Sequence, residues 1–245
     1  MPDGRRLVLA QAHGVRARAP GPVMRRTAAV GALGLAAVAT GCWRGSSTAS
    51  LLAPDAAALE RAGPDSFVVA FATSRGTFSV MVRRPWAPRG ADRVFFLVSN
   101  RYYDGVRFFR VVPGFVAQFG LHGDTAVTAA WRTRRIADDS VRASNTRGML
   151  TFAMGGPNTR TTQLFISYRD NSRLDATGFA PLGQVIAGMD VVDSLYGGYG
   201  EGAPRGQGPE QGRMVREGNA YLRERFPGLD SIAAARVTKR WTAPR

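Results

Sequence analysis

The chain has 245 residues, of which 44% are hydrophobic, and its formal net charge at pH 7 is +15. This hydrophobic content suffices for a packed core and excludes an intrinsically disordered chain. The charge does not indicate a nucleic-acid-binding surface, because the arginines are spread through every segment and cluster only in WRTRR, residues 131–135. We therefore expect a globular protein with a solvated basic surface.

Residues 1–42 have the pattern of an export leader. Two arginines follow Met24, and a run of small and apolar residues, 27–40, then leads to Gly41 and Cys42. A charged start, a short apolar run and small residues before a processing site are typical of a signal peptide, and the run is too short for a membrane-spanning helix. Translation from Met24 would give a signal of ordinary length.

Cys42 is the only cysteine, so no disulfide can form within one molecule. A single cysteine directly after such a segment resembles the lipobox of bacterial lipoproteins, in which the cysteine is lipidated and starts the mature chain. The resemblance implies a lipid anchor that holds the protein to a membrane of the cell envelope, on its periplasmic or extracytoplasmic face. The alternative is an ordinary secreted or periplasmic soluble protein, because Ala39 stands where lipoboxes usually have leucine.

Residues 43–65 are rich in alanine, serine, glycine and proline. This composition predicts a flexible tether, with one weak helix at residues 56–61. The folded domain is expected over residues 66–240.

The domain begins with a predicted hairpin. Apolar residues alternate in 67–71 and again in 78–82, on either side of Ser74-Arg75-Gly76. The apolar period then becomes helical over residues 87–100, with Pro88 near the start.

Short strands dominate the remainder. Further strand-like stretches follow at residues 106–112, 115–119, 149–153, 163–167 and 180–185, and a last one lies near 233–238. Helical periods predict two more helices, at residues 186–196 and 213–226, the second ending at Pro227-Gly228. Many short strands without strand–helix alternation predict a mainly β fold, a closed antiparallel barrel with a C-terminal helical extension.

The stretch FFRVVPGFVAQFG, residues 108–120, places Arg110 among apolar residues on predicted strands. A guanidinium stays charged at physiological pH and is costly to leave unpaired in an apolar setting. Arg110 is therefore either a surface residue of an edge strand or a fixed donor at the lip of an apolar pocket.

Two further motifs follow in order. They are RGMLTFAMGGPNTRTTQLFIS, residues 147–167, and RLDATGFAPLGQVIAGMDVVDSL, residues 173–195. Together with residues 108–120 they resemble the cyclophilin-type peptidyl-prolyl isomerases, over residues 66–200. The resemblance implies an eight-stranded barrel capped by two helices, with the active groove on one outer face.

The resemblance also implies roles for single residues. Arg110 matches the catalytic arginine, and Gln118 and Gln163 match the glutamines that hold this arginine and the substrate backbone. The positions that match the family's proline pocket and peptide-binding strand are Phe115, Val116, Ala153, Met154, Gly155, Phe165, Leu174 and Phe179.

Four positions depart from the best-known members. Met154 replaces an asparagine and Phe179 a histidine, whereas Val116 replaces a common methionine. Arg173 stands where many members have tryptophan or phenylalanine. Because members sensitive to cyclosporin use an indole at this place, we expect this chain to bind cyclosporin weakly.

The implied reaction needs no covalent step. Rotation about a peptide bond is resisted by about 18–20 kcal/mol, and the prolyl nitrogen becomes pyramidal and gains a lone pair during the rotation. A donor aimed at that nitrogen binds the transition state selectively. Arg110 supplies such a donor, worth about 1.5–3 kcal/mol, while the apolar pocket and residues 153–155 grip the substrate.

The sequence lacks the residues that other kinds of catalytic or cofactor site require. The two histidines are His13, in the leader, and His122, so neither a histidine-based triad nor a histidine metal cluster can form. The glycine turns lack the context of a phosphate loop. We expect no metal, no cofactor and no nucleic-acid partner.

The sequence thus predicts a monomeric peptidyl-prolyl cis-trans isomerase that acts on Xaa-Pro segments of unfolded or exported proteins. One alternative is a weakly active proline-peptide binding module or chaperone that uses the same groove. Another is an anchored barrel that holds a small apolar ligand, although small barrels are usually filled by side chains.

Overall fold

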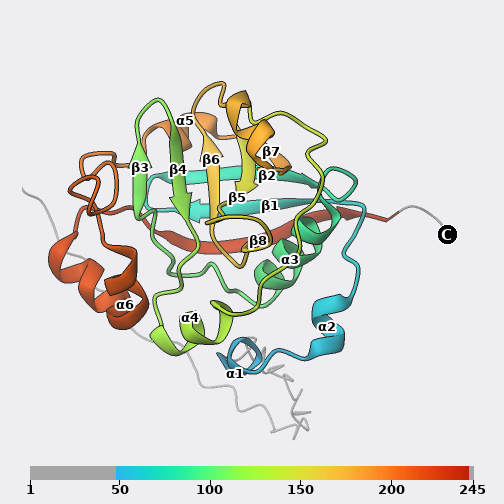
Figure 1. Cartoon of the computed structure of the whole chain (residues 1–245), viewed down its shortest axis with the longest axis horizontal. Coiled ribbons are helices and arrows are strands. Elements are labelled where there is room, and N and C mark those ends of the chain that lie inside the picture. Colours follow the sequence, from blue (N-terminus) through green and yellow to red (C-terminus); the bar gives the residue numbers. More distant parts are fainter. Residues whose placement is uncertain (1–47, 243–245) are drawn as a thin grey trace, which may run out of the picture. The chain divides into compact units, whose positions relative to one another are not determined.

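The computed structural model describes residues 48–242 (Figure 1). The predicted leader, with Met24 and Cys42, lies outside the described residues. No helix of the described part is long and apolar enough to cross a membrane.

Eight antiparallel strands form one sheet, in the order β3-β4-β6-β5-β7-β2-β1-β8. All eight lie where the apolar patterns predicted strands. Their bounds are β1 Ser66–Thr73, β2 Gly76–Arg83, β3 Arg110–Val112, β4 Val116–Phe119, β5 Met149–Phe152, β6 Leu164–Ser167, β7 Pro181–Ala187 and β8 Ile232–Trp241.

The prediction of a closed barrel is wrong, because the sheet curls into an open half-barrel with β3 and β8 at its edges. An antiparallel bridge between Arg107 and Ser231 brings the two edges together at one point. β3 has three residues and ends before Pro113, which lacks a backbone N–H. Along its outer edge Val111 bridges to Gly200 of a later loop, so this edge is covered by the loop and not by β8.

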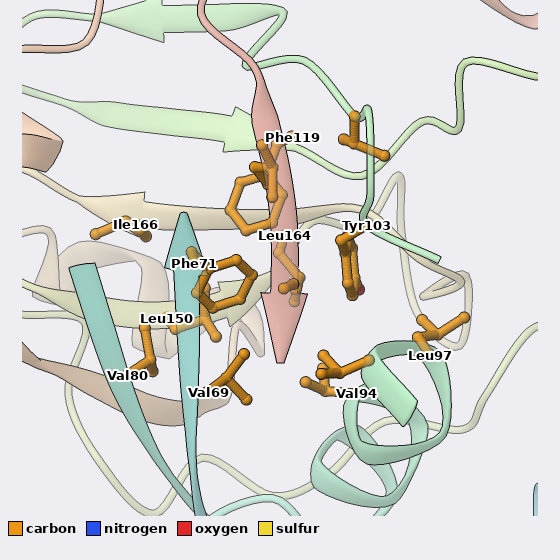
Figure 2. Close-up of a cluster of buried hydrophobic side chains, with 14 of the residues drawn as sticks. Val69, Phe71, Val80, Val94, Leu97, Tyr103, Phe119, Leu150, Leu164 and Ile166 are labelled. Carbon is orange, nitrogen blue, oxygen red and sulfur yellow. The ribbon is translucent and has the colours of Figure 1, made fainter. Parts of the chain in front are cut away.

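The concave face of the sheet is filled by large side chains. In β1, Phe67, Val69 and Phe71 alternate toward the interior and are fully buried. The ring of Phe71 stacks on Phe78 at 4.9 Å between centroids and meets Phe119 edge-on at 5.9 Å. Figure 2 shows Val69, Phe71 and Phe119 lying together with aliphatic residues of the neighbouring strands. Each fully buried side chain of this size stabilises the fold by about 1.5–3 kcal/mol.

Helix α3, Pro88–Ser99, confirms the helix predicted at residues 87–100. Proline at its first position needs no hydrogen-bond partner. The residue before the helix provides no side-chain cap. Instead, the carboxylate of Asp139 accepts the N–H groups of Arg89 at 3.0 Å and Gly90 at 2.9 Å.

The helix predicted at residues 186–196 is mostly absent. β7 continues through Ala187, and only the five-residue helix α5, Met189–Asp193, follows. The chain turns at Gly188, where φ is +76° and a Cβ would lie 2.5 Å from the carbonyl oxygen of Thr77. This close approach to β2 ends the strand and limits the helix.

Helix α6, Gln211–Arg225, confirms the C-terminal helical extension, and α4, Thr125–Trp131, was not predicted. α4 is capped by the carboxylate of Asp124, which accepts the N–H of Ala126 at 2.8 Å. Of the six α-helices among residues 48–242, only α3 and α6 exceed seven residues.

Residues 43–65 were predicted to form a flexible tether. From residue 48 onward the structure instead shows two short, packed helices. Helix α1, Thr48–Leu52, buries Leu51, whose carbonyl oxygen accepts the indole N–H of Trp131 at 2.9 Å. Helix α2, Ala56–Glu60, lies at the predicted weak helix and is capped by Asp55. Within the described residues, packing therefore already includes helix α1, ahead of residue 66.

Candidate active site

The sheet register aligns the predicted catalytic residues. Arg110 on β3 lies opposite Gln118 on β4, and Gln118 lies opposite Phe165 on β6. Arg110 Nη1 donates to Gln118 Oε1 at 3.0 Å, and Gln118 Nε2 donates to Gln163 Oε1 at 2.9 Å. The side chains of Arg110, Gln118 and Gln163 thus form one hydrogen-bonded row, which runs from β3 through β4 to the residue just before β6.

A cavity of about 370 Å³ opens beside this row. It contains nine of the eleven predicted site residues together with three that were not predicted. The lining residues are Arg110, Phe115, Val116, Gln118, Ala153, Met154, Phe165, Leu174, Phe179, Glu201, Arg205 and Gln211. The other two predicted residues, Gly155 and Gln163, line an adjoining cavity of about 300 Å³ that shares Ala153 and Met154 with the first. The structure therefore brings every predicted groove residue into one continuous region.

Aromatic rings form the apolar part of the cavity. Phe165 is buried and meets Phe179 edge-on at 5.8 Å between ring centroids. The Phe115 ring lies 5.4 Å from the guanidinium carbon of Arg110 and 5.0 Å from that of Arg173. Cations at these distances are attracted by the ring face, so both arginines are favoured at the edge of the pocket.

A short 3-10 helix, η1, Ser172–Thr177, positions the remaining wall. The N–H of Phe179 donates to the carbonyl of Leu174, and Asn171 Nδ2 donates to the carbonyl of Phe115 at 2.9 Å. These bonds connect the wall to the residue at the pocket floor. The apolar pocket therefore has a defined shape before a substrate arrives.

Glu201 is a site residue that the sequence reasoning missed. Arg110 Nε donates to Glu201 Oε1 at 2.6 Å, and Arg110 Nη2 donates to Glu201 Oε2 at 2.7 Å. The hydrogen bonds from Arg110 lower the pKa of Glu201 although partial burial opposes this, so the carboxylate stays ionised at neutral pH. The only local signal was one acid in the glycine-rich stretch YGEGAPRGQG, residues 199–208, which carries no family motif.

The description of the matching family model is "Cyclophilin type peptidyl-prolyl cis-trans isomerase/CLD", and the match covers residues 68–211. The chain belongs to the cyclophilin family. This cyclophilin is a peptidyl-prolyl cis-trans isomerase.

Two relatives illustrate the sequence similarity. This cyclophilin is 34% identical over 133 residues to a peptidyl-prolyl cis-trans isomerase of Acinetobacter baylyi, a match that covers 52% of this chain and 71% of the relative. It is 35% identical over 113 residues to the isomerase CYP18-1 of Arabidopsis thaliana, covering 44% of this chain and 69% of the relative.

A solved structure confirms the fold. The cyclophilin-type isomerase of Cryptosporidium parvum superposes with a TM-score of 0.52 at 19% identity, over 71% of this chain and 99% of the other. The same protein in the presence of the dipeptide Ala-Pro gives a TM-score of 0.51 at 18% identity, over the same shares of the two chains.

The arrangement suits non-covalent chemistry in this cyclophilin. Arg110 is a permanent cation whose side chain is 16% exposed, so it is screened from water yet open to the cavity. Among residues 48–242, no group of three or more histidine, cysteine, aspartate or glutamate side chains is placed to hold a metal ion. The cavity lining combines guanidinium groups, a carboxylate and amide groups with apolar side chains.

Proposed function

We propose that this cyclophilin accelerates rotation about Xaa-Pro bonds by directing Arg110 at the prolyl nitrogen while the proline ring occupies the pocket of Phe115, Phe165 and Leu174. The observation that carries the proposal is the row Arg110–Gln118–Gln163 at the edge of that pocket. The related structure studied with Ala-Pro supports an Xaa-Pro dipeptide as the unit that binds.

The donor count is favourable. A guanidinium has five N–H groups. Among residues 48–242, three of these N–H groups of Arg110 have partners, two in Glu201 and one in Gln118. One N–H on each terminal nitrogen of Arg110 is therefore left over, and these are the groups that we assign to the lone pair that develops on the prolyl nitrogen.

The energy required exceeds what one hydrogen bond supplies. Reaching milliseconds from unaided exchange means removing about 6–7 kcal/mol of barrier. A charge-assisted hydrogen bond from Arg110 contributes about 1.5–3 kcal/mol. We assign the remainder to fixed geometry, with the ring held in the pocket and the flanking peptide held along residues 153–155.

The alternative function is a binding module or chaperone that holds proline peptides in the same groove but turns them over slowly. Met154, Phe179 and Arg173 favour this alternative, because they depart from the best-known members. Exchange spectroscopy of an Xaa-Pro peptide with substoichiometric protein separates the two. We expect faster exchange at a small fraction of the peptide concentration. Saturable binding without faster exchange would support the binding module.

We also propose that the protein acts as a monomer on exported proteins at the cell envelope, anchored through a lipid on Cys42. The support is the leader pattern and the single cysteine directly after it. Five residues, 43–47, separate Cys42 from helix α1, and a chain of that length spans at most about 20 Å. The domain would therefore act close to the membrane surface, where exported polypeptide chains emerge.

Intact-mass analysis of the detergent-extracted protein tests the anchor. We expect a mature chain that starts at Cys42 and carries acyl mass, and one acyl chain alone would bind the membrane only marginally. The variant Cys42→Ser should remain unprocessed or be released in soluble form. A mature wild-type chain without acyl mass, or with another first residue, would indicate an ordinary secreted enzyme.

A further inference from the structure

The loop between α5 and α6, residues 194–210, runs beside β3 (Figure 1). Its antiparallel bridge pairs Val111 with Gly200. In an antiparallel pair the residue before one partner lies opposite the residue after the other, so the bridge sets Arg110 against Glu201. Backbone pairing of the loop with β3 therefore places the Glu201 carboxylate beside Arg110.

The backbone of this loop closes tightly around Glu201. The carbonyl oxygen of Glu201 accepts the N–H of Gly208 at 2.8 Å, and Glu201 Oε1 accepts the N–H of Gly202 at 3.0 Å. A Cβ at Gly206 would lie 2.3 Å from that carbonyl oxygen, and one at Gly208 would lie 2.8 Å from it. Only glycine fits at these two positions, so the glycine-rich sequence holds the glutamate in one place.

Arg110 is held along two sides of its guanidinium. Glu201 accepts two parallel hydrogen bonds, from Nε and Nη2, at 2.6 and 2.7 Å. Gln118 accepts one from Nη1 at 3.0 Å. A bidentate fork fixes the plane of a guanidinium, whereas a single amide acceptor leaves the group free to turn about that bond. The orientation of the two unused N–H groups therefore depends on Glu201.

We propose that Glu201 is a positioning residue for the isomerase reaction, which holds the Arg110 guanidinium so that its unused N–H groups face the prolyl nitrogen. This inference rests on the proposed role of Arg110. The carboxylate occupies the Nε side of the guanidinium and leaves a donor on each terminal nitrogen. Preorganised donors stabilise a transition state more than mobile ones, because no reorientation is needed during the reaction.

The principal test compares the full chain with its Glu201→Gln and Glu201→Asp variants in a protease-free exchange assay. Glutamine keeps the size but not the charged fork, and aspartate keeps the charge but is one methylene too short. We expect both to lower kcat by about tenfold with KM changed less than about twofold, since the lost geometry matters in the transition state. Glu210→Gln is the matched control, because Glu210 lies in the same loop and its nearest cation is Arg216, at 3.9 Å.

The pH profile is a second readout. The charged groups that face Glu201 are Arg110 on β3 and Arg205 in the loop. Because Arg110 lowers the pKa of Glu201, the fork is intact above the ordinary glutamate range and is lost as pH falls through the lowered pKa. The wild type should lose kcat on this acid limb toward the level of Glu201→Gln, and the variant should show no such limb.

The outcomes separate this proposal from the proposed mechanism. If Arg110→Ala is slow and Glu201→Gln keeps the wild-type kcat, the positioning role is wrong and the role of Arg110 stands. A higher kcat/KM in Glu201→Gln would show that the carboxylate competes with substrate, which also overturns the proposal. An Arg110→Ala variant at full rate would remove the mechanism and the positioning role together.

Discussion

Arg110 and Arg160 both pair with carboxylates, but they lie in opposite kinds of environment. The Arg160 side chain is 2% exposed, with Nη1 3.0 Å from Asp139 Oδ2 and Nε 3.1 Å from Asp138 Oδ1. Its Nη2 donates to the carbonyl of Ala137. The Arg110 side chain is 16% exposed, and its partner Glu201 is 29% exposed.

The two guanidinium groups differ in whether N–H donors remain available to a ligand. Arg160 is enclosed, and Asp139 also caps helix α3 through Arg89 and Gly90, so this pair joins distant segments of the chain. Arg110 faces a cavity and keeps unused N–H groups. The two sites share residue type and ion pairing. Access to the cavity and spare donors distinguish Arg110, which we propose to be catalytic, from the enclosed Arg160.

The largest expected effect comes from removing the buried arginine. Arg160→Met should lower the free energy of unfolding by about 3–5 kcal/mol, because the buried Asp139 carboxylate would lose the guanidinium 3.0 Å away and keep only the more distant Arg89, at 4.0 Å. Urea unfolding measures the loss, and the double variant Arg160→Met, Asp139→Asn should recover part of it. A loss below about 1 kcal/mol would show that the buried Arg160 pair stabilises the fold no more than a solvent-exposed ion pair does.

Removing the groove arginine should affect turnover and leave the fold intact. Arg110→Ala should lower kcat/KM by about a hundredfold or more, equivalent to about 2.7 kcal/mol, since a transition-state contact and no core volume is lost. Arg110→Lys should also be slow, because an ammonium cannot bind Gln118 and Glu201 with a planar fork. Exchange assays and thermal unfolding of the same preparations check both. Wild-type turnover in the alanine variant would contradict the mechanism.

A third arginine, Arg173, tests the wall of the same pocket. It is exposed and stacks near Phe115, and it offers no flat apolar indole to a cyclic peptide. We expect cyclosporin to inhibit the wild type only weakly and Arg173→Trp to bind it more tightly, with peptide turnover changed less than about twofold. Calorimetric titration with the drug measures this. Submicromolar inhibition of the wild type would contradict the expectation.

The smallest expected effect is a pH dependence that neither paired arginine can produce. Burial lowers the pKa of His122, the only histidine among the described residues, and its Nδ1 accepts the N–H of Asp124. The unfolded chain therefore takes up a proton near pH 6.5 before the folded chain does, so stability should fall as pH drops through that value. Urea unfolding between pH 7 and 5 checks the slope, which His122→Asn should remove. If His122→Asn keeps the same pH dependence of stability, other titrating groups cause it.

Local patterns in the sequence determined the strands and most of the groove. Strand patterns depend on neighbouring residues, and all eight strands lie where apolar stretches of the sequence predicted them. Arg110 and Gln118 are eight residues apart on a hairpin, so their contact follows from local pairing. The family motifs supplied the rest of the pocket, because Phe115, Phe165 and Leu174 each lie inside a motif.

Only the tertiary structure decided the features that depend on distant partners. Glu201 meets Arg110 across 91 residues, Asp139 caps α3 from 49 residues away at Gly90, and Leu51 accepts the Trp131 indole across 80 residues. None of these partners has a periodic or motif signal, because each contact is made by one side chain or one carbonyl group. The open sheet edge has the same origin, since the loop that covers β3 reaches it through a single bridge at Gly200. Local chemistry therefore determined which residues could form the site, and long-range packing determined how the arginine is held within it.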